Sequence, residues 1–331
     1  MTTRRSARRT EKWPGVSVIM PVLNEERHLR ASVRSILEQD YPGELEVVLA
    51  LGPSRDRTDE VAATLAADSR VKTVPSPTGR TPDALNLAIA ASRHPVVARV
   101  DGHSLLPEGY LQRAVELLDE TGADNVGGLM SARGVTDFEQ AVAHAMTSKI
   151  GVGNAAFHVG GEEGPADTVY LGVFRRSALE RVGGYDETFA RAQDWEMNFR
   201  IRSSGGLVWF SPTLSVSYRP RSSLSALARQ YFNYGRWRRH VMRSHLGSVN
   251  LRYLAPPTAL LGVLTGLVLS TFLTLWALTL PIGYLLLVIA GALWIGRGLP
   301  RKSRAVLPLV IATMHLAWGA GFLTSWRPAR E

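Results

Sequence analysis

A long uncharged stretch divides this chain into two parts that suit different solvents. From Leu254 to Ile295 there is no charged residue, whereas charges are spread throughout the chain before about Tyr253. Apolar segments of about 20 residues are long enough to cross a bilayer. The tail contains three of them, at roughly Pro257–Trp276, Leu278–Ile295 and Ala305–Leu323. We therefore expect about three transmembrane helices over residues 253–325, with a buried core hairpin as the alternative.

The distribution of basic residues predicts the orientation of the chain. The net charge is +9, and Lys and Arg gather at the N-terminus, between Arg219 and Arg252, and around Arg301, beside the apolar tail. Basic residues in these places favour the cytoplasmic side of a membrane and anionic head groups, so nucleic acid is not an expected partner. The N-terminus lacks the apolar run of a secretory signal. We expect a multi-pass plasma-membrane protein with a cytoplasmic large domain, Arg297–Arg304 on the cytoplasmic side and the tail 326–331 outside.

Strand and helix signals alternate through the first half of the chain. Strands are predicted at Val16–Pro21, Glu46–Leu51 and Val71–Val74, and helices at Glu25–Glu38 and Pro82–Ser92. Thr81 is a favourable N-cap for the second helix, since Pro82 suits a first helical position. This βαβα alternation predicts an α/β fold with a mostly parallel sheet covered by helices.

The run Val96–Val100 ends in a carboxylate and an imidazole, Asp101 and His103. Such a run suits a buried parallel strand, and parallel sheets bind ligands beyond the carboxyl ends of their strands. Both side chains can reach one divalent cation, which can neutralise a leaving diphosphate. An ordinary Asp-Gly turn is the alternative. The chain has no cysteine, which excludes disulfides, thiolate catalysis and Cys-ligated zinc.

Four further motifs fall where an enzyme that uses nucleotide sugars needs them. They follow the first strand, follow the second strand, precede the Asp101 strand and open a late helix, and they are Pro21–Glu26, Ser54–Thr58, Gly79–Thr81 with Asn86, and Gln193–Glu196. With these motifs the chain resembles the inverting family-2-type GT-A glycosyltransferases, and among them the succinoglycan-type chain-elongating membrane transferases. The resemblance runs from about Val16 to Arg243. It implies a GT-A, Rossmann-like domain that uses a nucleotide-sugar donor.

The resemblance also implies roles for individual residues. It places Pro21, Asn24, Glu25 and Asp56 in the nucleotide pocket, Asp101 at the donor and the metal, His103 at the metal, and Asp194 at the position of the catalytic base. The residues themselves allow other readings. Asn24 and Glu25 can instead cap the first helix, and Ser54 and Asp56 can form an Asx-type turn. Arg80 is either a bidentate contact to the donor diphosphate or a solvated surface residue.

The sequence departs from the family pattern in three places. Leu51-Gly52-Pro53 stands where acidic residues usually bind the nucleobase of the donor, so the sequence does not predict that this nucleobase is uracil. His103 replaces the second carboxylate of the metal motif, which favours Mn²⁺ somewhat and leaves Mg²⁺ open. Tyr218 stands in the region where a His often follows the last strands.

The need for a base at the position that the resemblance gives to Asp194 also follows from the chemistry. Displacing a nucleoside diphosphate from an anomeric carbon requires a group that takes the proton of the acceptor hydroxyl. A carboxylate stabilised by the helix dipole is the alternative for Asp194. Glu196 points away from Asp194 on a helix and can pair with Arg200, so we expect Glu196 to orient rather than to catalyse.

A basic amphipathic stretch, Leu224–Leu246, precedes the apolar tail. Within it Arg229–Trp237 resembles the Gln-x-x-Arg-Trp region of membrane-bound chain elongators, with altered spacing. That likeness implies that Gln230, Arg236 and Trp237 contact the acceptor sugar. Docking of an interfacial helix on the head-group layer is the alternative. The Gly-rich stretch Gly151–Gly164 is expected to be a loop near the site.

These observations predict an inverting, metal-dependent hexosyltransferase of exopolysaccharide or cell-envelope glycan synthesis. Its expected partners are a nucleotide sugar, a lipid-linked glycan acceptor, the membrane and polysaccharide-assembly proteins. The expected organisation is a basic disordered segment (1–14), a GT-A domain (15–220), an interfacial region (221–252), the apolar helices (253–325) and a tail (326–331). Two rivals are a polyprenyl-phosphate sugar synthase and a catalytically silent nucleotide-sugar-binding subunit.

Overall fold

The computed structural model describes residues 13–325 and contains one mixed sheet of eight strands. The predicted tail and most of the predicted basic N-terminal segment lie outside the described residues. The strand order is β3-β2-β1-β4-β7-β5-β8-β6, and only β7 and β6 run against the other strands. The strands are β1 (Val16–Val22), β2 (Leu45–Leu51), β3 (Val71–Pro75), β4 (Val96–Arg99), β5 (Asn125–Ala132), β6 (Gly164–Pro165), β7 (Tyr170–Arg175) and β8 (Val208–Tyr218). The predicted mostly parallel α/β sheet is confirmed.

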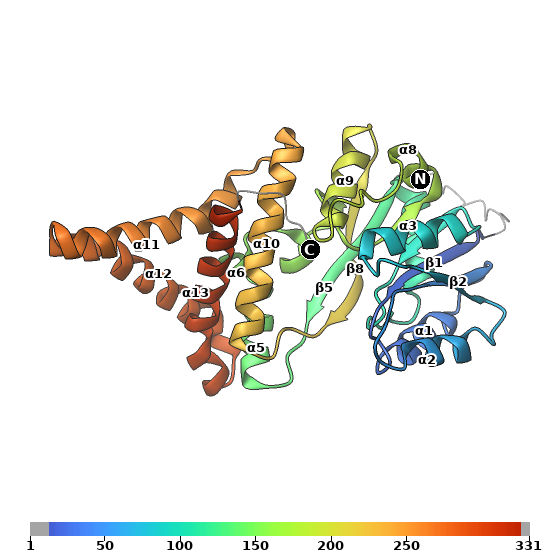
Figure 1. The fold of residues 1–331 in the computed structure, drawn as a ribbon, viewed down its shortest axis with the longest axis horizontal. Coiled ribbons are helices and arrows are strands. Elements are labelled where there is room, and N and C mark those ends of the chain that lie inside the picture. The colour runs from blue at the N-terminus through green and yellow to red at the C-terminus, as the bar shows by residue number, and fades with distance from the viewer. Residues whose placement is uncertain (1–12, 326–331) are drawn as a thin grey trace, which may run out of the picture.

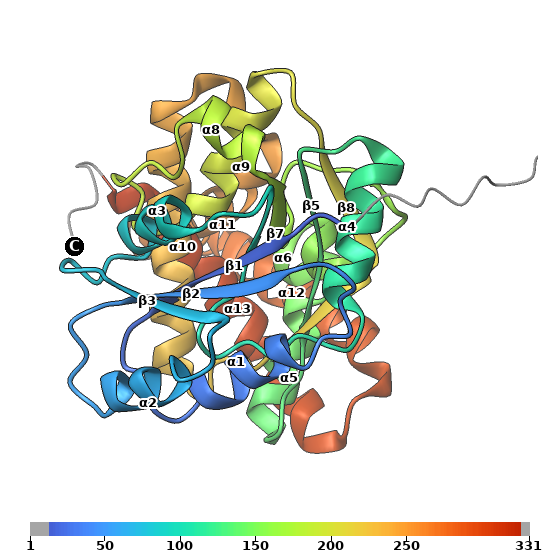
Figure 2. The same cartoon turned by 90° about the vertical axis from the view of Figure 1, so that its right-hand side faces the viewer.

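Helices cover both faces of the sheet (Figure 2). Alternate residues of a strand point to opposite faces, so Val18 and Met20 of β1 join one apolar cluster while Ile19 joins the other. The first cluster lies under α1 (Leu29–Leu37), α2 (Thr58–Leu65) and α4 (Tyr110–Thr121). The second lies under α3 (Thr81–Ala91), α8 (Arg176–Val182) and α9 (Gln193–Ser203). Burial on both faces explains why these strands read as continuous apolar runs.

The predicted starts of two helices are corrected. Asn24 and Glu25 do not cap α1, which begins at Leu29 after a turn, with His28 at the N-cap position. Asn24 instead adopts a left-handed backbone conformation (φ 55°), which an Asn tolerates better than most residues. At α3 the helix already includes Thr81, and Arg80 occupies the N-cap position.

Strands β5 and β8 carry the chain from the sheet towards the apolar helices. Their pairing shifts register between Gly127 and Leu129, and a Cβ on Gly128 would collide with the backbone carbonyl of Leu214. This close approach bends the strand pair, whose far ends continue into α5 (Asp137–Met146) and α10 (Leu224–Ser244). The predicted loop Gly151–Gly164 instead contains one-turn helices, α6 (Lys149–Val152) and α7 (Ala156–Val159).

Three C-terminal helices are long and apolar enough to cross a membrane. Two of them, α11 (Ala255–Phe272) and α12 (Thr279–Ile295), project away from the sheet domain, whereas α13 (Arg301–Thr324) runs alongside α10 (Figure 1). Large apolar side chains such as Phe272 and Trp276 are more than four-fifths exposed on the projecting hairpin. Short 3-10 turns join α10 (Leu224–Ser244) to α11, α11 to α12, and α12 to α13, namely η1 (Leu246–Ser248) and η2 (Leu251–Leu254), then η3 (Leu275–Leu278), then η4 (Gly296–Gly298).

Glycines hold α10 and α13 in backbone contact. A Cβ on Gly235 would collide with the carbonyl of Trp318, and a Cβ on Gly321 would collide with the carbonyl of Phe232. Polar contacts then tie both ends of α13 to the sheet domain or to α10. At its start, Ser303 Oγ lies 3.0 Å from Asp137 Oδ1 of α5. At its end, Arg239 of α10 donates to the carbonyl oxygens of Phe322 and Leu323.

Candidate active site

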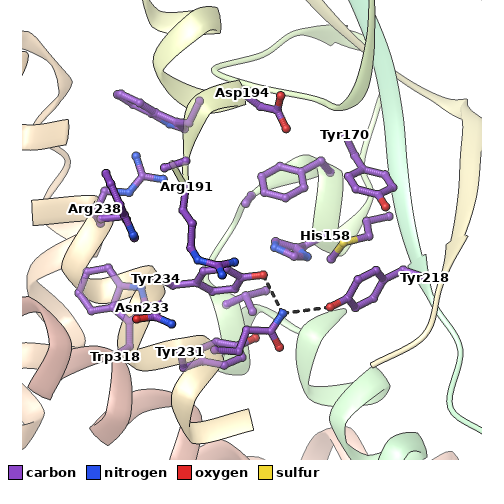
Figure 3. Close-up of a pocket in the computed structure, with 18 of the residues that line it drawn as sticks. His158, Tyr170, Arg191, Asp194, Tyr218, Tyr231, Asn233, Tyr234, Arg238 and Trp318 are labelled. Carbon is purple, nitrogen blue, oxygen red and sulfur yellow. Dashed lines mark hydrogen bonds between the residues drawn. The ribbon is translucent and has the colours of Figure 1, made fainter. Parts of the chain in front are cut away.

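One large cavity connects the C-terminal edge of the sheet with the inner side of the apolar helices. Its volume is about 1180 Å³. Asp194 lies towards one side of it, Tyr218 and Tyr231 towards another, and Trp318 of α13 beside α10 (Figure 3). Seven Lys or Arg side chains line it against three carboxylates, those of Glu25, Asp101 and Asp194. The excess of positive charge suits anionic ligands such as a nucleoside diphosphate.

Arg99 joins the two predicted functional carboxylates. It is the last residue of β4, 5% exposed, and its Nη2 lies 3.0 Å from Asp101 Oδ1 while its Nη1 contacts Asp194 Oδ1. Sheet topology explains the meeting, since β4 ends at this edge and α9, which carries Asp194, packs on the same face. Asp101 and Asp194, which are far apart in the sequence, therefore share one guanidinium.

The surroundings of Asp194 favour its protonated form. Burial raises the pKa of the Asp194 carboxyl above its usual value, the Arg99 charge lowers it, and the nearby Asp101 charge raises it again. A carboxylate whose pKa lies above the usual range is a better proton acceptor when ionised than an ordinary aspartate. The position therefore suits a general base that takes a hydroxyl proton.

His103 and Glu25 form a second polar pair in the lining of the cavity. His103 Nδ1 lies 2.8 Å from Glu25 Oε1, and this hydrogen bond raises the pKa of the imidazole. Among residues 13–325 no group of three or more His, Asp or Glu side chains is arranged to hold a metal ion. Asp101 and His103 offer one oxygen and one nitrogen ligand. Such a pair fits Mn²⁺ or Mg²⁺ only when phosphate oxygens and water complete the shell, as is usual for Mg²⁺.

Two more predicted donor residues line the cavity and three lie outside its lining. Pro21 and Glu25 line it, whereas Asn24, Asp56 and Arg80 do not. Asp56 accepts hydrogen bonds from the backbone N–H groups of Glu26 and Thr58. Asn24 Oδ1 accepts one from the N–H of Arg55. Arg80 Nη2 donates to the carbonyl of Glu187. These contacts agree with the alternative interpretations, in which Asp56 stabilises a turn and Arg80 is a surface residue, and they place Asn24 against that same turn. A role in nucleotide binding stays a prediction for all three.

The predicted acceptor residues divide in the same way. Gln230 and Trp237 line the cavity, and Gln230 Nε2 donates to Tyr218 Oη at 3.0 Å and to Tyr234 Oη at 2.9 Å (Figure 3). Arg236 lies outside the lining. Glu196 is buried, also outside the lining, and pairs with Arg200 at 2.6 Å as expected, and with His245 at 3.1 Å. Glu196 therefore stabilises the position of α9 through these ion pairs and does not itself line the cavity.

Sequence reasoning missed several residues of the cavity. Arg99 lies in a run that is otherwise apolar. An Arg inside a buried strand is itself a signal, because a buried charge needs a partner of opposite charge. Arg238 lies on the amphipathic stretch, where its position on the cavity side appears only once α10 is placed, whereas the Tyr rings of this stretch, Tyr231 and Tyr234, line the cavity as expected for rings that stack on an acceptor sugar. His158 comes from the Gly-rich stretch, and its burial lowers the pKa of the imidazole to about 4.

The sheet, the carboxylates at its C-terminal edge and the basic cavity define a nucleotide-sugar transferase of the GT-A class. Comparison with known proteins agrees. Residues 17–183 match the family model described as "Glycosyl transferase family 2". The chain is 32% identical over 314 residues to "Succinoglycan biosynthesis protein ExoA" of Rhizobium meliloti (strain 1021), covering 94% of this chain and 93% of that protein. The protein belongs to glycosyltransferase family 2.

A more distant curated protein and a solved structure are also similar to this chain. A glucuronosyltransferase of Methanococcus voltae, whose name gives a dolichyl N-acetylglucosaminyl phosphate as acceptor, is 22% identical over 93% of this chain and 95% of its own length. The mannosyltransferase PcManGT of Pyrobaculum calidifontis, solved with GDP-Man and Mn²⁺, has a TM-score of 0.61 at 20% identity, covering 96% of this chain and 88% of its own. The latter likeness shows the shared GT-A fold.

Proposed function

We propose that this glycosyltransferase inverts the configuration of the transferred sugar by a single displacement, with Asp194 as the base. The observation that carries the proposal is the shared contact of Arg99 with Asp101 and Asp194. In this proposal Asp101, which would act on the donor diphosphate, and Asp194, which would take the acceptor proton, lie at the same guanidinium. An acceptor hydroxyl that lies between them can attack the anomeric carbon as the diphosphate leaves.

The donor would lie along the edge formed by Pro21, Glu25 and Asp101. A divalent cation, Mn²⁺ or Mg²⁺, bound by Asp101 and His103 would neutralise charge on the leaving diphosphate. The Mn²⁺ present with GDP-Man in PcManGT supports this part of the proposal. Asp101 would also keep Arg99 in place while the donor is bound.

The acceptor would be a membrane-linked glycan of exopolysaccharide or cell-envelope synthesis. The name of the Rhizobium relative and the dolichyl-linked acceptor in the name of the Methanococcus relative support this class. So does the cavity, because it runs from Asp194 to the apolar helices. Gln230, Tyr234 and Trp237 would contact the acceptor sugar through hydrogen bonds and ring faces.

The proposed location is the plasma membrane, with the sheet domain in the cytoplasm and the α11–α12 hairpin inserted in the bilayer. The basic residues that flank the apolar helices support this orientation. Helix α10 carries Arg236, Arg238 and Arg239 and is unsuited to spanning. Because α13 runs beside α10 and both of its ends contact polar residues, we place α13 at the interface, with Thr324 on the cytoplasmic side.

The test is transfer of radiolabelled sugar by the purified full-length protein, with and without Mn²⁺. Prenyl diphosphate sugars and prenyl monophosphate are offered as separate acceptors, and NMR of the product gives its anomeric configuration. We expect transfer to the lipid-linked sugar with inversion. Transfer to the prenyl monophosphate alone would identify a polyprenyl-phosphate sugar synthase, and absence of turnover with every donor would contradict the proposal.

A further inference from the structure

Arg238 is a cationic residue of the cavity that forms no ion pair with a carboxylate of residues 13–325. Its guanidinium lies between two aromatic rings, with Cζ 4.5 Å from the Trp195 ring centroid and 4.4 Å from that of Tyr253. Its Nη1 atom is buried and has no hydrogen-bond partner among the described residues. Burial lowers the pKa of this guanidinium, and the Arg252 charge acts in the same direction.

This arrangement restricts the plane of the cation and leaves Nη1 without a hydrogen-bond acceptor among the described residues. Rings on two sides restrict the guanidinium, and cation–π attraction offsets part of the cost of burying its charge. The three residues come from separate elements, since Trp195 is on α9, Arg238 on α10 and Tyr253 on η2. A planar, preoriented guanidinium with an unpartnered N–H group is suited to binding a phosphate, which a guanidinium can contact through two N–H groups.

A second cation adjoins the first. Arg252 also lies over the Tyr253 ring, with Cζ 5.0 Å from its centroid, and its Nη1 donates to Asn154 Oδ1 at 2.7 Å. Both arginines line the cavity. The only carboxylate within 4.0 Å of Arg252 among the described residues is Asp167, at 3.8 Å. Two guanidiniums held this close repel one another, and a bound dianion would relieve that repulsion.

The position of the pair specifies the kind of anion. Asp194 immediately precedes Trp195, the residue whose ring contacts Arg238, and in Figure 3 Arg238 lies on the same side of the cavity as Trp318, with Asp194 above them. On the other side the cavity continues among the apolar helices, where it is lined by Ala255, Ala259, Leu287, Val288, Met314 and Trp318. A ligand that fills the whole cavity is therefore polar at Asp194, anionic at Arg238 and apolar beyond it.

We propose that Arg238, supported by Arg252, binds the phosphate of a prenyl-phosphate-linked acceptor, whose sugar reaches Asp194 and whose chain lies between α11, α12 and α13. The assignment rests on the proposed function for the identity of the sugar-bearing end. It makes Arg238 a specificity residue that distinguishes phosphate-linked acceptors from neutral glycolipids. Trp195 then connects the sugar-binding and phosphate-binding parts of the site, because it follows the proposed base Asp194 in the sequence and its ring contacts the Arg238 guanidinium.

The test measures binding to the full-length protein in detergent micelles by tryptophan fluorescence, since Trp195 and Trp318 line the cavity. The probes are geranylgeranyl diphosphate, geranylgeraniol and inorganic diphosphate. We expect the prenyl diphosphate to bind much more tightly than the alcohol or the free diphosphate. Arg238→Gln should weaken its binding about ten- to a hundredfold, as expected for loss of a charge-assisted hydrogen-bond pair. Equal binding by inorganic diphosphate would overturn the lipid assignment.

Three comparisons keep the result interpretable. Arg238→Lys should recover part of the affinity because it keeps the charge without the planar fork. Arg243→Gln, an exposed position on the same helix, should change nothing. Binding of UDP or GDP should be the same in Arg238→Gln as in the wild type. Wild-type affinity for geranylgeranyl diphosphate in folded Arg238→Gln would overturn the assignment, as would a parallel loss of nucleotide binding.

The same variants separate this inference from the proposed function. In transfer assays Arg238→Gln should raise the KM for a prenyl diphosphate sugar with little change in kcat, and donor hydrolysis should persist. If the wild-type protein turned over no nucleotide sugar yet bound geranylgeranyl diphosphate through Arg238, the proposed function would fail and the phosphate site would stand. If Arg238→Gln transferred sugar as well as the wild type, the phosphate site would fail and the function would stand.

Discussion

Arg99 at the end of β4 contacts both Asp101 and Asp194, and so couples the donor side of the cavity to the proposed base. Its charge opposes two influences that raise the pKa of Asp194, namely burial and the Asp101 charge. The guanidinium holds the two carboxylates next to each other at one edge of the sheet. In the proposed mechanism Asp101 acts towards the donor and Asp194 towards the acceptor.

Replacing Arg99 with Met should shift the pH dependence of transfer. Without the positive charge the pKa of Asp194 rises further, and a base acts only when deprotonated, so the acid limb of the kcat profile should move to higher pH. The profile of kcat against pH measures this shift. Arg34→Met, which breaks an exposed pair with Glu38, is the control and should leave the profile unchanged. An unshifted limb in Arg99→Met would show that Asp194 is not the titrating base.

Replacing Asp101 with Asn should remove the stimulation of donor binding by Mn²⁺. The substitution keeps the shape of the side chain but deletes a charged ligand of the cation. Calorimetry of UDP and GDP binding with and without Mn²⁺ measures the effect. Asp119→Asn, an exposed carboxylate paired with Arg175 and outside the cavity lining, is the control. Retention of full Mn²⁺ stimulation in Asp101→Asn would rule out the metal assignment.

His158 should make the protein less stable in mild acid. Its pKa is about 4 in the folded protein against an ordinary value of 6.5, so below about pH 6.5 the unfolded chain binds more protons than the folded one. The free energy of unfolding therefore falls as pH falls from about 6.5 towards 4. His158→Phe should flatten the dependence of Tm on pH over that range, whereas His28→Gln, at an exposed position, should not. An equally steep dependence in His158→Phe would contradict this account of the buried imidazole.

Cysteine labelling tests the placement of α13, because the natural chain has no cysteine. Lys302→Cys and Thr324→Cys are exposed positions near the two ends of α13. We expect an impermeant maleimide to label both only after the cells are opened. Leu273→Cys, at the exposed tip of the α11–α12 hairpin, should be protected by the bilayer or labelled from outside. Labelling of Thr324→Cys in intact cells would contradict the interfacial placement of α13. It would support the topology that the positive-inside pattern alone predicts, with the tail outside.

The sequence predicts the sheet well because its strands are buried on both faces. The run Val96–Val100 is apolar apart from Arg99 for that reason, and the carboxyl ends of parallel strands meet at one edge, so the residue pattern predicts that Asp101 lies at that edge. The pattern alone leaves an ordinary Asp-Gly turn as the alternative. Asp194 could be assigned only with the help of resemblance, because its α9 reaches the edge through non-local packing. Asn24 and Asp56 show the limit of local motifs, since a polar residue after a strand serves a turn as readily as a ligand.

The apolar half of the cavity could not be predicted from local patterns. Its lining depends on Gly235 and Gly321, which let α10 and α13 approach at the backbone. Each glycine is unremarkable within its own helix. The position of Arg238 follows from this contact, together with the rings of Trp195 and Tyr253 from two other elements. Long-range packing of this kind has no periodic signal in the sequence.

The central claim is that Asp194 is the base of an inverting transfer, and Asp194→Asn tests it most directly. The amide keeps the size of the side chain and cannot accept the proton of the acceptor, so kcat should fall about 10²–10⁴-fold. Donor affinity should barely change, and Asp186→Asn, outside the cavity lining, should remain active. The measurement is single-turnover transfer to a prenyl diphosphate sugar with NMR of the product. The account predicts the lost rate together with inverted product from the wild type, and it is contradicted by retained configuration or by normal turnover in Asp194→Asn.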